Sequence, residues 1–117
     1  MSFSFAQLTD THLYGSSAVE PCPNEPKDEV FLNFHDEVAQ HNVDFMVNTG
    51  DLNTGGAGGE MDRYEYFMSL MDQVKQRTGI PVYVTRGNHD FGRIIDSEYE
   101  RTCGTSTYWF EHQGWAF

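Results

Sequence analysis

The chain has 117 residues, with 18 acidic and 7 basic side chains, and its formal net charge is −11. This length provides one small domain, and the acidic balance disfavours attraction to nucleic acid or to an anionic membrane, since both require a positive patch. No apolar run approaches the ~20 residues of a membrane-spanning helix, and no signal peptide is recognisable. Cys22 and Cys103 do not form the pattern of a disulfide framework. These features predict a cytoplasmic protein with no nucleic-acid and no membrane partner.

Three short apolar runs bounded by turn residues predict strands at residues 3–8, 43–48 and 80–85. Between them, residues 27–41 and 60–77 have the apolar spacing of helices. The order β-α-β-α-β predicts parallel strands joined by right-handed crossovers, and therefore an α/β fold. The apolar faces expected to meet the core are Val30, Phe31, Phe34 and Val38 in the first helix, and Tyr64, Phe67, Met68, Met71 and Val74 in the second.

The pattern changes after residue 90. A short helix is expected near residues 94–101, followed by two strands, 108–110 and 115–117, around a turn at 111–114. The chain stops inside an apolar strand, whereas most domain ends are polar and frayed. Residues 1–117 are therefore expected to be a single domain that is the truncated N-terminal half of a longer one. The apolar edge at its C-terminal end predicts self-association.

Polar residues with metal-binding side chains follow each of the three predicted strands. They are Asp10 and His12 after the first strand, Asp51 after the second, and Asn88 and His89 after the third. Because the carboxyl ends of parallel strands meet at one edge of a sheet, these side chains are expected to lie close together. Carboxylate, imidazole and amide oxygen are ligands for divalent ions of the Mn, Zn or Fe class. The sequence therefore predicts a metal centre.

The three blocks D-x-H, G-D and G-N-H-D, in this order, resemble the signature of the calcineurin-like metallophosphoesterase family. The resemblance covers essentially the whole chain. It implies a β-sandwich flanked by helices, of which this chain holds the front half, β-α-β-α-β plus a hairpin. It also implies hydrolysis of a phosphomonoester or phosphodiester by two divalent metal ions of the Mn, Zn or Fe class, which would clamp the phosphate and activate water. The acidic net charge favours a small phosphoester over a nucleic acid as the substrate.

The resemblance implies the metal ligands individually. Asp10 and His12 would bind the first ion, Asp51 would bridge both ions, and Asn88 would bind the second. The family normally adds three histidines from two later blocks, and neither block occurs in this chain. The first ion would keep three of four protein ligands and the second only two of four, so the 117-residue chain is expected to be inactive or feeble. The other histidines, His35, His41 and His112, are interpreted as surface or turn residues.

The resemblance also implies catalytic roles. His89 would stand beside the leaving group as an acid or phosphate stabiliser, and Asp90 would orient it through a hydrogen bond. Arg86 and Arg93 flank the third block and have two interpretations, contact with a substrate phosphate or solvated pairing with nearby carboxylates. The glycine cluster at residues 55–59 lacks the Gly-Lys-Ser/Thr ending of a phosphate loop and is read as a rim loop. The alternative function is a non-catalytic protein-binding scaffold on the same fold, which would need none of the metal ligands.

Overall fold

The computed structural model describes residues 2–13, 28–52, 60–90, 96–105 and 107–117. Cys22, Arg93 and the glycine cluster at residues 55–59 lie outside the described residues. The elements follow the predicted β-α-β-α-β order and then continue with two short helices and a hairpin. In chain order they are β1 (Phe5–Leu8), α1 (Asp28–Ala39), β2 (Phe45–Asn48), α2 (Glu60–Thr78), β3 (Val82–Val84), η1 (Asn88–Asp90), α3 (Asp96–Cys103), β4 (Glu111–His112) and β5 (Trp115–Ala116).

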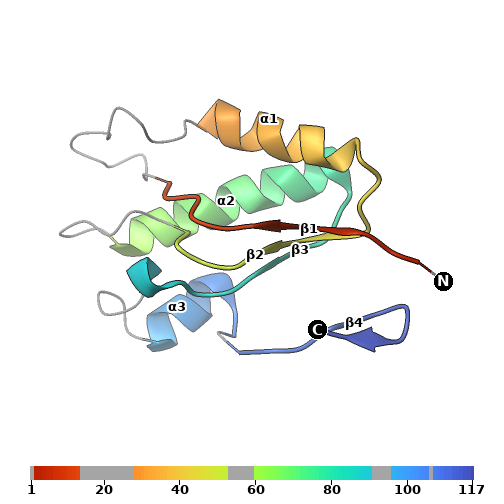
Figure 1. Cartoon of the computed structure of the whole chain (residues 1–117). Coiled ribbons are helices and arrows are strands. Elements are labelled where there is room, and N and C mark those ends of the chain that lie inside the picture. The colour runs from red at the N-terminus through yellow and green to blue at the C-terminus, as the bar shows by residue number, and fades with distance from the viewer. Residues whose placement is uncertain (1, 14–27, 53–59, 91–95, 106) are drawn as a thin grey trace.

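The three strands of the main sheet are parallel, as the sequence predicts. Their order is β1-β2-β3, with Phe5 opposite Phe45 and Met46 opposite Val82. Each strand is a few residues shorter than its apolar run. Because all three run in one direction, the segments that follow them leave the sheet at the same edge (Figure 1). The predicted positions of the three blocks relative to the sheet are therefore confirmed.

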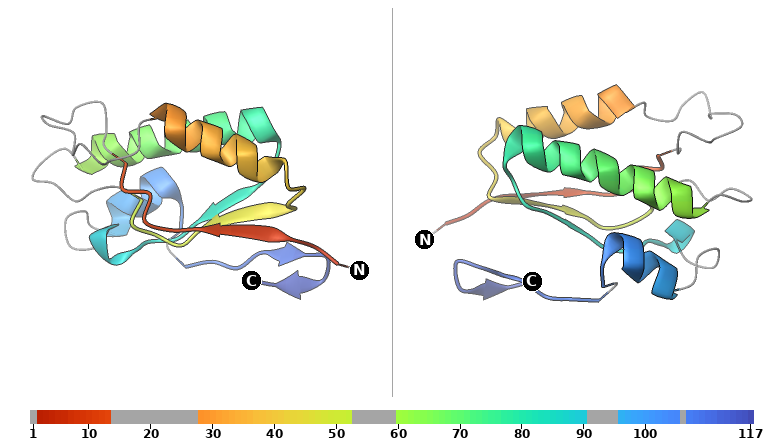
Figure 2. Two further views of the ribbon diagram at one scale, coloured as in Figure 1. Left: turned by 45° about the horizontal axis from the view of Figure 1, so that its top comes forward. Right: turned by 180° about the vertical axis from the view of Figure 1, so that it is seen from behind.

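Helices α1 and α2 lie side by side on one face of the sheet (Figures 1 and 2). Their buried apolar side chains form one core with Val84 of the sheet, Tyr99 of α3, and Leu13 and Leu52 of the loops. Full burial of one such side chain contributes about 1.5–3 kcal/mol. Hydrogen bonds from Tyr66 to Asp28 and from Arg77 to Asp36 also join the two helices. The stripe predicted on α2 is confirmed at Tyr64, Phe67, Met71 and Val74, while Met68 is half-buried against the core. Among the side chains of α2 that the structure describes, Leu70 is buried as well.

The face predicted for α1 is wrong. Phe31 is buried as expected, but Val30 and Phe34 are 59% and 49% exposed, and His35 is buried with only 1% exposure. The interpretation of His35 as a solvated residue is therefore also wrong. Its Nδ1 lies 2.8 Å from the carbonyl oxygen of Phe31 one helical turn earlier, so one polar atom of the buried ring is satisfied inside the helix. That hydrogen bond lets a histidine occupy a buried position in the helix. No described helix has the length and apolar character needed to cross a membrane.

The C-terminal hairpin lies against the other face of the sheet (Figure 2). The predicted four-residue turn is wrong, since strands β4 and β5 pair around only Gln113 and Gly114. Both residues have positive φ, 49° and 82°, which is the geometry of the two-residue turns that match strand twist. Aromatic rings pack between the hairpin and the sheet. The centre of the Phe45 ring lies 5.3 Å from the centre of the Phe110 ring and 5.1 Å from the centre of the Phe117 ring.

Candidate metal centre

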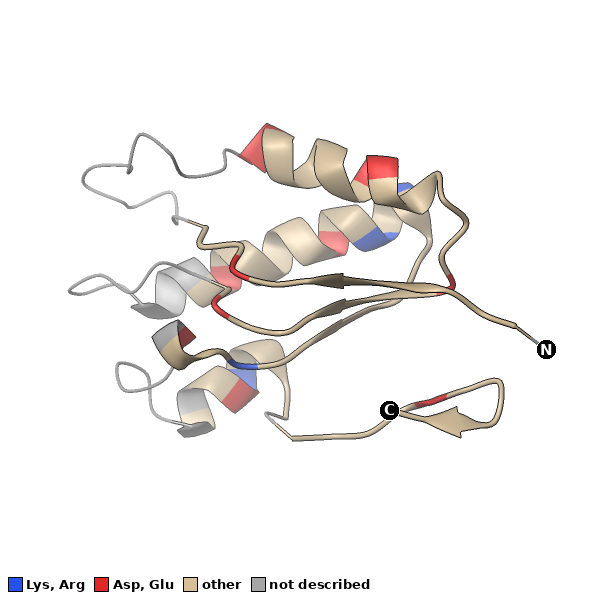
Figure 3. Ribbon diagram, in the orientation of Figure 1, with Lys and Arg blue, Asp and Glu red and all other residues tan. Residues whose placement is uncertain are grey.

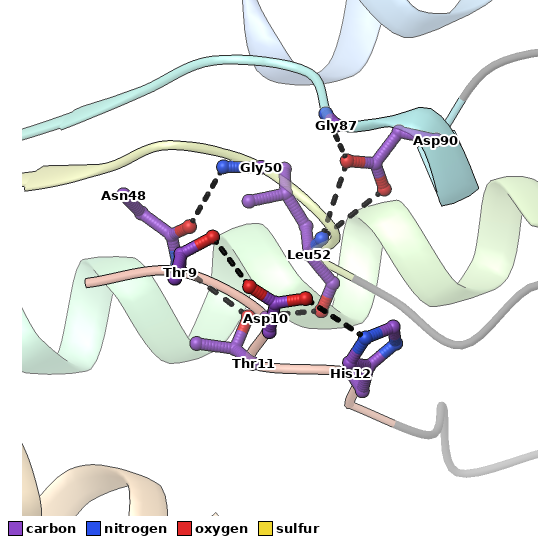
Figure 4. A network of polar contacts seen from close by, with 9 residues as sticks. All are labelled: Thr9, Asp10, Thr11, His12, Asn48, Gly50, Leu52, Gly87 and Asp90. Carbon is purple, nitrogen blue, oxygen red and sulfur yellow. Dashed lines mark hydrogen bonds and ion pairs between the residues drawn. The ribbon is translucent and has the colours of Figure 1, made fainter.

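The first two blocks are held together by backbone hydrogen bonds that continue the β1–β2 ladder beyond the strands. Asp10 N–H donates to the Gly50 carbonyl over 3.1 Å, and His12 N–H donates to the Asp51 carbonyl over 3.0 Å. Leu13 then bonds to the carbonyl of Leu52 over 3.0 Å. The segments that follow β1 and β2 therefore run beside each other (Figure 4). In Figure 3, acidic residues occur in both segments and in η1, at the same end of the sheet.

Three of the predicted ligands meet at this edge. One donor atom from each of Asp10, His12 and Asp51 lies within 4.8 Å of the other two. Asp10 is exposed, His12 is half-buried, and Asp51 is buried. The His12 Nε2 lies 3.6 Å from Asp10 Oδ1. Two carboxylates and an imidazole suit divalent ions of the Mn, Zn or Fe class, so the donor set fits the implied metal, and the exposure of Asp10 leaves the group open to solvent.

All three of these residues have a left-handed backbone. The φ angles are 55° for Asp10, 44° for His12 and 52° for Asp51. This region is uncommon for residues other than glycine, although Asp and His are enriched in it, and such conformations persist only where the surroundings hold them. Here the paired backbones of the two loops do so. With this backbone, the donor atoms of Asp10 and His12 on one loop and of Asp51 on the other lie close together.

Two glycines bring the second and third blocks together. Gly50 has a φ of 113°, and a Cβ on it would lie 2.2 Å from the backbone nitrogen of Gly87. A Cβ on Gly87 would lie 2.2 Å from both the nitrogen and Oδ1 of Asp51. Both glycines are therefore required for close approach of the backbones, and Gly50 also provides a turn with positive φ. Asn88 is exposed and begins η1 directly after Gly87, so the contact of Gly87 brings its backbone near Asp51.

Polar side chains that the sequence analysis did not single out fix the first two loops. Asn48 is fully buried at the end of β2; its Oδ1 accepts from Gly50 N–H at 3.1 Å, and its amide donates to the Thr11 hydroxyl at 3.4 Å. The Thr9 hydroxyl donates to Asp10 over 2.7 Å, and this hydrogen bond is the main cause that lowers the pKa of Asp10. In the sequence, the one feature that indicates these hydrogen bonds is an asparagine at the end of an otherwise apolar strand.

The third block is organised around the buried Asp90. Its carboxylate accepts hydrogen bonds from the backbone and from a tyrosine, and the Arg86 guanidinium donates to its carbonyl oxygen over 3.0 Å. The Arg86 Cζ also lies 4.6 Å from the centre of the Tyr99 ring. Arg86 is thus held within its own loop. The side chain of His89 lies outside what the structure describes, so the orientation of His89 by Asp90 stays a prediction.

A sequence model of the calcineurin-like phosphoesterase family matches residues 3–116. The chain belongs to the calcineurin-like phosphoesterase family. The match covers every block discussed above and agrees with the parallel α/β arrangement of the structure. Members of the calcineurin-like phosphoesterase family hydrolyse phosphoesters, and the group formed by Asp10, His12 and Asp51 is a possible metal site. No curated protein matches the chain in sequence.

Proposed function

We propose that this chain provides metal ligands for the hydrolysis of a small phosphomonoester or phosphodiester by two divalent ions. The observation that carries the proposal is the convergence of Asp10, His12 and Asp51, whose donor atoms lie within 4.8 Å of one another. They come from two separate loops and all have left-handed backbones. A protein-binding scaffold would gain nothing from this costly arrangement, so the convergence favours catalysis.

The proposed roles of the individual residues are those that the family resemblance implies. Asp10, His12 and Asp51 hold the first ion, and Asp51 together with Asn88 contributes to the second. Bound divalent ions would supply positive charge for the phosphate oxygens and activate water. His89 serves as the acid or phosphate stabiliser. Arg86 and Arg93 are proposed as phosphate contacts; for Arg86 this requires its guanidinium to serve substrate while it donates to the Asp90 carbonyl.

The net charge of −11 restricts how substrate binds. An acidic protein repels phosphates, so attraction must come from a strong local field of opposite sign. Bound metal ions are the largest local charges in such sites. The substrate proposed here is therefore a small phosphoester rather than a nucleic acid, whose many phosphates would meet the acidic surface outside the site.

Titration calorimetry with Mn²⁺ tests the proposal on the whole 117-residue chain. We expect one weak site, because three donors converge for the first ion while Asp51 and Asn88 are the only proposed donors for the second. Asp51→Ala should weaken Mn²⁺ binding by more than about 100-fold, beyond the ~10–100-fold typical of residues that only support ligands. His89→Ala should leave binding nearly unchanged. Asp72→Asn is the matched control, since Asp72 is an exposed carboxylate on α2.

The same samples should be assayed with a chromogenic phosphodiester. We expect turnover near background in the 117-residue chain, because a single weakly held ion cannot clamp the phosphate from both sides. Unchanged Mn²⁺ affinity in Asp51→Ala would contradict the proposed metal centre. Two tight sites together with rapid turnover would contradict the ligand count and would indicate that a second chain donates the missing ligands.

A further inference from the structure

A tyrosine on α2, outside the three blocks, contacts the framework of the candidate metal centre. Tyr64 is buried with 3% exposure, and its hydroxyl donates to Asp90 Oδ1 over 2.8 Å. Asp90 itself is buried with 1% exposure. A buried carboxylate requires hydrogen-bond donors, and this hydroxyl is a donor that comes from a helix rather than from the motif loops.

The other donors to the Asp90 carboxylate among the described residues are backbone groups of the second and third blocks. Gly87 N–H lies 2.8 Å from Oδ2, and Leu52 N–H lies 3.2 Å from each carboxylate oxygen (Figure 4). Leu52 directly follows Asp51, and Gly87 directly precedes Asn88. The carboxylate of Asp90 therefore joins the backbones beside both residues that are proposed to bind the second ion.

We propose that Tyr64 is a positioning residue that holds Asp90 in the orientation which fixes the second and third blocks relative to each other. Its effect on metal binding rests on the proposed function, whereas its effect on the two loops does not. The hydroxyl stabilises the carboxylate from the side of α2, and Asp90 then keeps Leu52 and Gly87 together. Without the hydroxyl, Oδ1 would keep, among the residues that the structure describes, only the longer contact with Leu52, and the carboxylate could rotate away from that amide.

The chemistry of the hydroxyl supports this role. Burial, and next the charge of Asp90, raises the pKa of Tyr64, so its hydroxyl remains protonated over the whole physiological range. A protonated phenol has one proton to donate, and the distance of 2.8 Å assigns it to Asp90. Phenylalanine at this position would keep the ring in the core and remove only the donor.

Tyr99 provides a matched control. It is buried with 1% exposure, and its ring packs edge-to-face against the Tyr64 ring, with the two ring centres 5.6 Å apart. Its hydroxyl has no hydrogen-bond partner among the residues that the structure describes. Tyr99→Phe therefore removes the same atom from the same cluster without removing a hydrogen bond to Asp90.

The first experiment measures amide hydrogen exchange by NMR in the metal-free chain. In Tyr64→Phe, the amides of Leu52 and Gly87 should exchange about 10-fold faster or more, the effect of losing one hydrogen bond to a charged group. In Tyr99→Phe both rates should stay unchanged. The amide of Val74 in the core of α2 serves as the reference for global unfolding. Equal exchange at Leu52 and Gly87 in both variants would overturn the proposal.

The second experiment measures metal binding in both variants. Mn²⁺ affinity should fall by about 10–100-fold in Tyr64→Phe, the usual effect of losing outer support for ligands, and should not change in Tyr99→Phe. The visible spectrum of the Co²⁺-loaded chain should shift only in Tyr64→Phe, because that spectrum reports ligand geometry. Wild-type metal binding with identical affinity and spectrum in both variants would overturn the positioning role at the centre. Faster exchange in a chain that binds no metal would support the loop role and overturn the proposed function alone.

Discussion

At the scale of single residues, backbone conformation determines whether the donors can converge. Asp10, His12 and Asp51 each adopt a left-handed φ, and each is held there by a neighbouring loop. Asp and His tolerate this region better than most residues, so the side chains that bind metal are also among the few that fit the backbone. The same residue types therefore satisfy the chemical and the conformational requirement.

A methyl group at Gly87 tests how closely the second and third blocks must approach. In Gly87→Ala the new Cβ would lie 2.2 Å from Asp51 Oδ1 and from its backbone nitrogen, so Asp51 must move. We expect Mn²⁺ affinity to fall by at least about 10-fold, as for other changes that displace a ligand. Titration calorimetry on the folded variant provides the measurement.

Gly79→Ala is the control for this substitution. Gly79 has a φ of 69°, but nothing lies within 4 Å of a Cβ built on it. This variant should lose about 1–2 kcal/mol of stability, the cost of a left-handed Cβ, while Mn²⁺ affinity stays the same. Equal Mn²⁺ affinity in Gly87→Ala and wild type would show that Asp51 needs no close approach of the third block.

At the scale of elements, the sequence predicts order and direction better than faces. Short apolar runs separated by helical patterns permit few arrangements other than parallel strands, so the edge that carries Asp10 and Asp51 follows from sequence. The buried face of α1 does not, because residues 30, 31, 34 and 38 and residues 31, 32 and 35 both have helical spacing. The choice depends on packing against α2 and on the hydrogen bond of His35 to Phe31.

The support around the site was equally inaccessible from sequence. The contact of Asp90 with Leu52 spans 38 residues, and the contact of Asp90 with Tyr64 spans 26. Neither pair has a local signature, because each forms only after the sheet has brought the loops together. The sequence correctly predicts Tyr64 as a core residue. It does not predict the hydrogen bond from the Tyr64 hydroxyl to Asp90, which connects this residue to the candidate metal centre.

The burial of His35 in α1 predicts a dependence of stability on pH. Burial lowers the pKa of His35 below 6.5, although its hydrogen bond to Phe31 and the charge of Asp36 oppose the effect. The unfolded chain therefore takes up a proton near pH 6.5 that the native chain does not. Stability should be complete above pH 6.5 and should fall as the pH decreases towards the native pKa, by at most about 1.4 kcal/mol per pH unit for one proton.

Chemical denaturation of wild type and His35→Gln between pH 7.5 and 5.5 measures this effect. Glutamine can still donate to the Phe31 carbonyl but does not titrate, so its free energy of unfolding should change less with pH. His41→Gln, at an exposed position just after α1, is the control and should follow wild type. Identical slopes for wild type and His35→Gln would contradict a neutral buried histidine.

At the scale of the whole molecule, the two faces of the sheet are covered unequally. Helices α1 and α2 cover one face, and the hairpin lies on the other (Figure 2). Near the hairpin, several large aromatic side chains are in contact with solvent. Trp115 is 64% exposed, and Phe5 and Phe117 are also exposed. Large exposed apolar side chains favour association where they form a patch, while the net charge of −11 opposes contact between two copies.

These opposing effects predict self-association that strengthens with salt. Screening shortens the range of charge repulsion from about 10 Å at 0.1 M ionic strength to about 3 Å at 1 M, while the attraction between aromatic surfaces persists. Sedimentation velocity should therefore show a larger fraction of dimer or higher species at 1 M than at 0.1 M NaCl.

Trp115→Gln should weaken association by at least about 10-fold, because burial of one large apolar side chain contributes about 1.5–3 kcal/mol. Phe34→Gln removes an exposed aromatic ring from α1 on the opposite face and should have no effect. A compact monomer at high concentration in 1 M salt would contradict self-association, and an equal loss in both variants would place the contact elsewhere than the hairpin face.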